Sequence, residues 1–333
     1  MKKIGLCGLP NSGKSTLLKL LTQKDVEIAN YPFTTKKPNI AVALVISKNL
    51  LKLYEITNTK ELIAPYLEFF DVPGLIKGSH RGLGLGNEFL SYLRSCDVIL
   101  EVVRNFKNEN ILHIEGNVDV ERDILIIEEE IIESDKKIIE ENIKNLEKKP
   151  KEKEKLNALV ELKNKLEPFR RFEEFKELLK EFNLLVIKDW FLIINGENYN
   201  VEKLKNLCFK NIYQMDFKYE LEIEEDEFFK KEFKSQKLQF LNDFREDLNL
   251  LEFYTFTKEI TQGWFLENGK TILYAANLIH SDFSKKFKYA EVINIEDFLK
   301  IKDWNIAKSQ GKLHIVGKDY LVKEGDITVS YTH

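Results

Sequence analysis

The chain has few cysteines, and their positions exclude several kinds of site. Cys7, Cys96 and Cys208 are far apart in a chain of 333 residues. They show none of the short spacings that zinc-binding or redox motifs require. A disulfide framework is therefore not expected, and a reducing, cytoplasmic setting is the simplest interpretation.

Long apolar runs and an excess of charge of one sign are also missing. Without an uncharged apolar run we expect no membrane span and no membrane partner. The first residues, 2–8, have the pattern of a strand, so no signal peptide is expected. The formal net charge of −4 gives no global attraction to nucleic acid. We expect no DNA partner, and contact with RNA would need a local basic patch.

The first part of the chain alternates between strand and helix patterns. Such alternation predicts an α/β fold, a mostly parallel sheet with helices on both faces. A break in this pattern separates residues 1–118 from residues 184–250, and together they are predicted to form one nucleotide-binding domain. The expected strands are 4–7, 40–46, 66–71, 97–103 and 190–195, and the expected helices in the first range are 13–21 and 87–95.

Residues 119–183 have a helical pattern instead. Ile124, Ile131 and Ile138 recur every seven residues, which is typical of a long amphipathic helix. A Lys/Glu-rich turn around Pro150 follows, and then a second helical pattern whose apolar residues include Phe169. We expect an antiparallel helical hairpin inserted into the α/β domain. From 251 to 333, short strands and turn signals predict a small α+β domain.

A phosphate-binding loop is the strongest motif. Gly8, Gly13, Lys14 and Ser15 fit the pattern G-x4-G-K-S, after a strand and before a helix. Loop amides and the helix N-terminus then face the phosphates, Lys14 reaches the β/γ oxygens, and the Ser15 hydroxyl ligates Mg²⁺. The predicted nucleotide-binding residues of this loop are Asn11, Ser12, Gly13, Lys14, Ser15 and Thr16.

Two further segments are predicted to serve the same site. Asp71 and Gly74 form an Asp-x-x-Gly sequence at the end of an apolar strand. The carboxylate can hold the hydration shell of Mg²⁺, and the Gly74 amide can contact the γ-phosphate. Thr35, in a loop, can place a hydroxyl on Mg²⁺. The predicted metal ligands are thus Ser15, Thr35 and Asp71.

The residue that orients the attacking water is less evident. Ras-like proteins place a Gln after Asp-x-x-Gly, but Leu75 stands there and cannot hydrogen-bond a water. Asn11 offers an amide oxygen to a monovalent cation such as K⁺, or is a simple turn residue. His113 follows a strand on the nucleotide side of the sheet, and is either a water-orienting group or a structural histidine.

Several segments together resemble one family. GLPNSGKST, NYPFTTKKPNI, DVPGLIKGSHRGLGLGNEFL and NENILHIEGNVD are similar to the YchF family, called Ola in eukaryotes, of the Obg-related P-loop proteins. The end of the chain resembles that family's ubiquitin-like TGS domain. The resemblance implies an ATPase that associates with ribosomes, and so with ribosomal RNA. It also implies that His113 acts in catalysis. Lys14, which reaches the β/γ oxygens, is the second predicted catalytic residue.

The base-reading segment departs from the family pattern. GTPases use Asn-Lys-x-Asp and the family Asn-x-x-Glu, whereas this chain has Asn195 and Asn198 around Gly196-Glu197. An Asn amide offers one donor and one acceptor, which suits adenine and cannot accept both guanine protons. ATP is therefore expected over GTP, although the departure argues against GTP more firmly than it argues for ATP. An alignment that places Glu197 at the reading position is the alternative. An Obg-type GTPase, or a nucleotide-gated ribosome- or RNA-binding module with negligible hydrolysis, are the alternatives.

Two basic segments are possible RNA contacts. Lys285-Lys286-Phe287-Lys288 interleaves an aromatic residue with basic ones, although a solvated turn has the same composition. Lys148–Lys155, at the expected tip of the hairpin, is better interpreted as a solvated turn.

Overall fold

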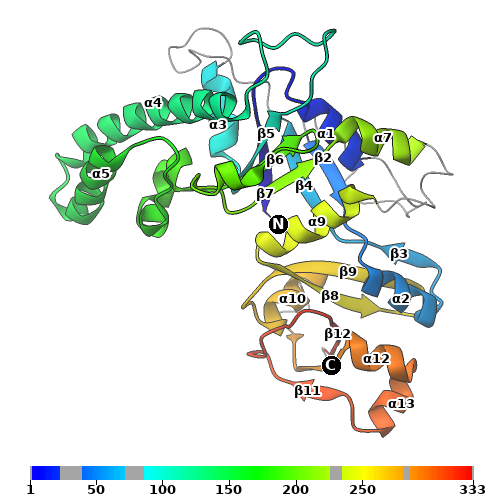
Figure 1. The fold of residues 1–333 in the computed structure, drawn as a ribbon. Helices are drawn as coiled ribbons and strands as arrows, with labels where there is room; N and C mark the ends of the chain where they lie inside the picture. The colour runs from blue at the N-terminus through cyan, green and yellow to red at the C-terminus, as the bar shows by residue number, and fades with distance from the viewer. Residues whose placement is uncertain are drawn as a thin grey trace.

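Two six-stranded sheets organise the chain (Figure 1). The computed structural model describes residues 2–22, 40–71, 86–225, 235–280, 282 and 286–331. None of the helices within these ranges is long and apolar enough to cross a membrane.

The first sheet is the predicted mostly parallel one. Its strands are ordered β2-β4-β1-β5-β6-β7. β2 pairs antiparallel with β4, and the other four neighbouring pairs are parallel. Every residue of β5 is buried, as expected for a central strand of a sheet covered on both faces. The strands are β1 (Lys3–Cys7), β2 (Ile40–Leu44), β4 (Tyr66–Asp71), β5 (Val98–Arg104), β6 (Asp189–Asn195) and β7 (Ile212–Met215).

Helices cover both faces of this sheet. Successive β5 residues contribute to different clusters, because side chains alternate across a strand. Leu100 packs in the cluster of α1 and α9, while Ile99 packs with α3 and the hairpin. The two helices predicted before residue 119 are confirmed to within one residue. The helices around the sheet are α1 (Lys14–Thr22), α3 (Gly86–Arg94), η6 (Val201–Leu204), α7 (Phe217–Glu225) and α9 (Gln236–Asp247).

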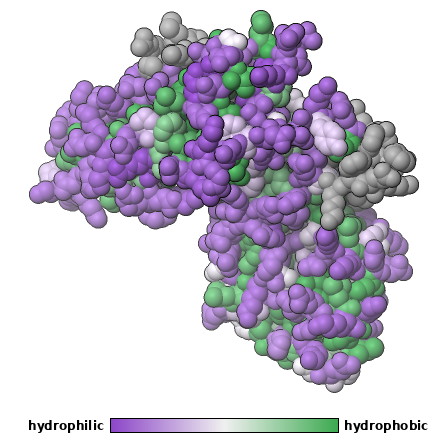
Figure 2. All heavy atoms as spheres, in the orientation of Figure 1, coloured by the Kyte–Doolittle hydropathy of each residue, from purple (hydrophilic) through white to green (hydrophobic). Residues whose placement is uncertain are grey.

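The inserted hairpin projects from the first sheet (Figure 1). α4 (Val120–Leu146) begins at the N-cap Asp119 and packs against α5 (Lys153–Lys165). Leu159 and Leu162 of α5 are buried with Ile131 and Ile139 of α4. The face of this arm seen in Figure 2 is mainly hydrophilic, in line with a solvated tip.

The second hairpin helix is shorter than the sequence predicted. We expected it to carry Phe169, but α5 ends at Lys165. Pro168 explains the difference, because a proline disfavours helical geometry in the residue before it. The chain then returns through short helices: η3 (Glu173–Phe175), α6 (Lys176–Leu179), η4 (Lys180–Phe182) and η5 (Leu185–Ile187), while η2 (Pro150–Glu152) forms the tip.

The second sheet is built mainly from the C-terminal residues. Its order is β11-β10-β12-β8-β9-β3. The turn signals mark real turns: Gly269 and Gly325 have φ of +84° and +79°, a region that favours glycine. The elements are β8 (Leu250–Phe256), β9 (Ile260–Glu267), α10 (Ile272–Ile279), β10 (Tyr289–Asn294), α12 (Ile295–Ile301), α13 (Trp304–Ser309), β11 (His314–Val316) and β12 (Asp326–Tyr331).

One early segment joins this second sheet. α2 (Lys48–Thr57) and β3 (Glu61–Ile63) lie within residues 1–118, which the sequence assigns to the nucleotide-binding domain. β3 nevertheless pairs in parallel with β9. Leu50 and Leu53 of α2 are buried with Tyr254 and Ile327 of the C-terminal strands. The two sheets are therefore tied together by the connection between β2 and β4.

Candidate nucleotide-binding site

The phosphate-binding loop lies between β1 and α1. Gly8 and Gly13 have φ of +150° and +108°, and Asn11 has φ of +63°. A Cβ on Gly13 would lie 2.2 Å from Nδ2 of Asn195, closer than any side chain tolerates. The second glycine of the motif is thus required by both its backbone conformation and its neighbour.

The Lys14 ammonium is turned into its own loop. Nζ donates to the carbonyl oxygens of Gly8, at 2.8 Å, and Leu9, at 2.9 Å. Burial lowers the pKa of Lys14, while the neighbouring Cys7 and Asp71 oppose this shift. Two main-chain carbonyl oxygens therefore hold the Lys14 ammonium against the phosphate-binding loop.

Asp71 stands at the same edge of the sheet. It ends β4 and pairs in register with Leu6, just before the loop. Burial raises the pKa of this half-buried carboxyl, and the charge of Lys14 partly counters the shift. Ser15 lies in the first turn of α1 and is exposed. A carboxylate and a hydroxyl are the hard oxygen donors that Mg²⁺ prefers, so this pair fits the predicted metal. Thr35, Gly74 and Leu75 lie outside the described residues.

Asn195 connects the loop to the end of β6. Its Nδ2 donates to the Ser12 carbonyl at 3.0 Å, and its Oδ1 accepts from the Phe217 amide at 3.3 Å. The side chain is thus engaged with the protein, although the sequence placed it at the base. Asn198, the other predicted base contact, is exposed with φ of +58°.

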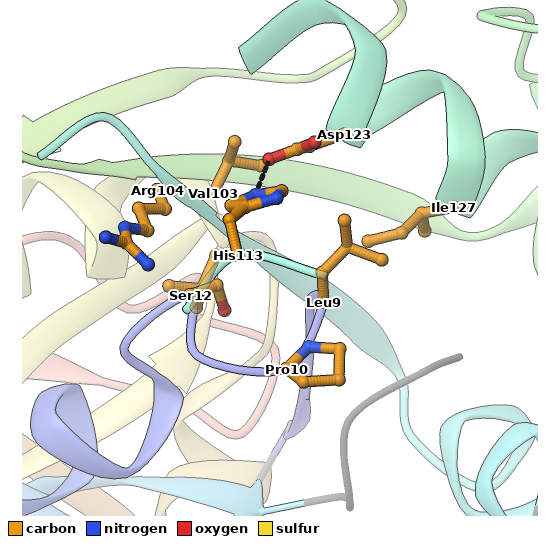
Figure 3. Close-up of a pocket in the computed structure, with 9 residues that line it drawn as sticks. Leu9, Pro10, Ser12, Val103, Arg104, His113, Asp123 and Ile127 are labelled. Atoms are coloured by element: carbon orange, nitrogen blue, oxygen red, sulfur yellow. Dashed lines mark hydrogen bonds and ion pairs between the residues drawn. The ribbon is translucent and has the colours of Figure 1, made fainter. Parts of the chain in front are cut away.

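His113 lies beside the loop, in a hollow shown in Figure 3. Its Nε2 is 2.7 Å from Oδ2 of Asp123, and its Nδ1 accepts from the Glu115 amide at 3.2 Å. Its side chain is only 4% exposed. The hollow is also lined by loop residues, so the structure brings His113 to the phosphate-binding loop but turns its ring toward α4. The lining residues are Leu9, Pro10, Ser12, Val102, Val103, Arg104, His113, Asp123 and Ile127.

The segment that carries His113 is held by an arginine. Arg104, at the end of β5, donates to the carbonyl oxygens of Phe106, Asn108 and Ile111 at 3.0, 3.3 and 3.0 Å. The segment also contacts the phosphate-binding loop, because Nδ2 of Asn11 donates to the Leu112 carbonyl at 3.0 Å.

Sequence reasoning missed Arg104 and Asp123. Both carry a signal that could have been used. Arg104 is a charged residue directly after an apolar strand, on the side of the sheet where ligands bind. Asp123 follows His113 by ten residues, in the first turn of the predicted hairpin helix. Neither signal identifies its partner.

The glycine-framed loop, the buried lysine and the carboxylate at the end of β4 define a P-loop nucleoside triphosphatase. Two family models match the chain. One is described as "50S ribosome-binding GTPase" and covers residues 3–155. The other, YchF-GTPase_C, is described as "Protein of unknown function (DUF933)" and covers residues 250–332.

Curated relatives match over nearly the whole length. "Ribosome-binding ATPase YchF" of Buchnera aphidicola is 36% identical, covering 98% of this chain and 97% of the relative. The protein of the same name from Bacillus subtilis is 34% identical, covering 97% of each. The structure of the Schizosaccharomyces pombe YchF GTPase has a TM-score of 0.83 and 28% identity, covering 99% of this chain and 97% of that one. This chain belongs to the YchF family.

Proposed function

We propose that this protein is a Mg²⁺-dependent ATPase that works as a switch on ribosomes in the cytoplasm. The observation that carries the proposal is the P-loop site, with Lys14 and Asp71 at one edge of the sheet. Relatives at 34–36% identity that are named ribosome-binding ATPases add the partner and the nucleotide. We also propose that residues 251–333 are the TGS domain, which the resemblance to the YchF family implies; the YchF-GTPase_C family model covers residues 250–332.

Each site residue has a different proposed role in binding the nucleotide and its metal ions. Phosphate oxygens would replace the Gly8 and Leu9 carbonyls as partners of the Lys14 ammonium. Ser15 and Asp71, with Thr35, would hold the Mg²⁺, which when bound stabilises charge on the β/γ oxygens. Nδ2 of Asn11 is bound to Leu112, so its amide oxygen is the group for a K⁺ ion.

His113 is proposed to orient the water. Leu75 cannot do so, and the ring of His113 lies in the hollow beside the loop. A positioned general base or water-orienting group contributes about 10²–10⁴-fold to the rate. In the orientation observed, the ring faces Asp123, so it has to turn before it acts.

Base preference is the test that separates ATPase from GTPase. The GTPase alternative has support, because the S. pombe relative is called a GTPase. Guanine presents two adjacent donors, and the Asn198 amide satisfies only one. A mispaired polar group costs about 1–3 kcal/mol, so ATP should bind roughly 5- to 150-fold more tightly.

Competition titrations of ATP and GTP measure this preference. Asn198→Asp restores a double acceptor and should narrow or reverse the preference. Asn200→Asp, two residues further along the same exposed loop, is the matched control and should leave it unchanged. Tighter binding of GTP by the parent protein would show that Asn198 does not read the base.

Measuring ATP turnover with and without ribosomes distinguishes an ATPase switch from a module that binds ribosomes without hydrolysing ATP. A switch should hydrolyse ATP faster when purified ribosomes are added, and should bind them differently with ATP and ADP. A protein that binds ribosomes under nucleotide control but shows no turnover in either condition is the non-hydrolysing module instead.

A further inference from the structure

The ring of His113 is fixed from two sides. Nε2 is 2.7 Å from Oδ2 of Asp123, and Nδ1 accepts from the Glu115 amide (Figure 3 shows the first contact). Because Nδ1 is the acceptor, this network assigns the proton to Nε2, which donates to the carboxylate. Both nitrogens are engaged, and neither is available to a water.

Asp123 is itself held in place by hydrogen bonds from a second residue. Its Oδ1 accepts from Nε and Nη2 of Arg122, at 3.1 and 2.8 Å. Arg122 is in turn anchored to the carbonyl and side chain of Asn117. The Asp123 side chain is 3% exposed. A carboxylate that is buried, paired and held in the first turn of a helix is a fixed acceptor, so the position of the ring follows from it.

The same segment contacts the nucleotide loop. The Leu112 carbonyl, one residue before His113, accepts from Nδ2 of Asn11. Leu112 itself is 82% exposed, and Ile114 is 42% exposed. The segment is thus bound at its base by Arg104 and at its centre by Asn11 and Asp123. A change at the phosphate-binding loop or a partner at the exposed residues can act on it.

We propose that Asp123 is a positioning residue: it holds His113 in a resting orientation, and turnover requires the bond from Nε2 to Asp123 to open. This inference deepens the proposed function and rests on it, because it needs His113 to orient the water. A charge-assisted hydrogen bond favours the resting orientation, so the engaged orientation is a minor population without a partner.

Removal of the acceptor is the direct test. In Asp123→Ala the resting orientation loses its charged partner, and ATP turnover without ribosomes should rise about tenfold, the shift expected from a charge-assisted bond. Asp123→Asn keeps an acceptor oxygen without the charge, and should give a smaller rise. A fall in turnover in these variants, folded by circular dichroism, would mean that Asp123 supports the engaged orientation, which overturns the proposal.

Two further variants show whether the rise in ATP turnover depends on His113. Asp119→Ala damages the start of the same helix, because Asp119 accepts from the Arg122 amide, but it does not remove the partner of His113. It should turn over at the parent rate. In the double variant Asp123→Ala/His113→Ala the gain should vanish, and a gain that persists overturns the proposal.

The ring nitrogens provide a readout that does not depend on turnover. ¹⁵N NMR of the side chains distinguishes the two neutral tautomers, and His113→Ala identifies its signal among the five histidines. The parent should show the Nε2–H form, and Asp123→Ala should lose this preference. A parent ring without the preference overturns the positioning role, whatever the rates. Turnover at the parent rate in His113→Ala, with the preference intact, overturns instead the catalytic role in the proposed function.

Discussion

At the scale of single residues, hydrogen bonds from the side chains of Lys14 and Asn195 hold the phosphate-binding loop. Lys14 donates to two carbonyls of its own loop, and Asn195 donates to the Ser12 carbonyl from the end of β6, two strands away from β1 in the sheet. These bonds fix the loop before a nucleotide binds, which lowers the entropy lost on binding.

Lys14→Ala should weaken ATP binding by about 10- to 100-fold, since a hydrogen bond to a charged group contributes about 1.5–3 kcal/mol. The Gly8 and Leu9 carbonyls also lose their donor, but the fold should persist. Isothermal titration gives the affinity, and circular dichroism checks the fold. Lys19→Ala, an exposed lysine of the same helix, is the control and should bind ATP normally. Near-normal ATP affinity in a folded Lys14→Ala variant would contradict the assignment of the phosphate site.

At the scale of elements, one arginine links the nucleotide-binding part to the hairpin. Arg94, the last residue of α3, pairs with Asp135 of α4 at 2.5 Å and donates to Ser134 at 2.7 Å. Asp135 is fully buried, and its other oxygen accepts from the Val186 amide. Burial raises the pKa of Asp135, and the Arg94 guanidinium lowers it, so the carboxylate depends on this partner. α3 and the hairpin are therefore expected to move together.

Arg94→Ala should lower the free energy of unfolding by about 3–5 kcal/mol, because it leaves the Asp135 charge buried without its partner. Urea denaturation measures the change. Lys163→Ala removes the exposed hairpin pair Lys163–Glu140, and should cost no more than about 1 kcal/mol. Adding Asp135→Asn to Arg94→Ala should recover part of the loss. Equal effects of Arg94→Ala and Lys163→Ala would contradict the structural role of the buried pair.

At the scale of the whole molecule, a buried carboxyl lies where α2 and the second sheet meet. Glu252 of β8 is 2% exposed and accepts from the Tyr254 hydroxyl at 3.0 Å. A Cβ on Gly263 would lie 2.8 Å from Pro65 and 2.9 Å from Glu252, so this junction is tightly packed. Burial raises the pKa of Glu252 from 4.5 to about 7; Tyr254 and Arg245 favour the charged form, and Glu324 opposes it.

The parent protein should lose stability as the pH rises from about 4.5 to about 7, relative to Glu252→Gln. In this window the folded state retains a proton that the unfolded state has released, so each unit by which the pH rises lowers the free energy of unfolding. The shift corresponds to roughly 3 kcal/mol at higher pH, at about 1.4 kcal/mol per unit. Urea denaturation of both proteins from pH 5 to pH 8 measures the difference. Parallel curves for the two proteins would show that Glu252 does not titrate in this range.

Much of the fold followed from local patterns. The strand at 66–71 and the helices at 14–22 and 86–94 were predicted to within a residue, since apolar periodicity and the glycine motif are properties of adjacent residues. The heptad pattern also predicts the hairpin, but its second helix ends at Lys165, before Phe169, because Pro168 disfavours helical geometry in the residue before it. The P-loop itself was predicted because the motif includes its own context of strand and helix.

The sequence by itself predicted a P-loop nucleotide-binding site and its residues, and it determined which family the chain resembles. Only the tertiary structure decided how His113 is turned, that Asn195 holds the loop, and that α2 and β3 pack on the C-terminal sheet. Asn195 and Ser12 are 183 residues apart, and Leu62 pairs with Thr261. Such contacts depend on how packed elements meet, and the periodicity of one segment contains no information about its distant partner. His113 adds a second reason: its ring orientation depends on which hydrogen-bond acceptor lies in reach, and Asp123 reaches it only once α4 is placed.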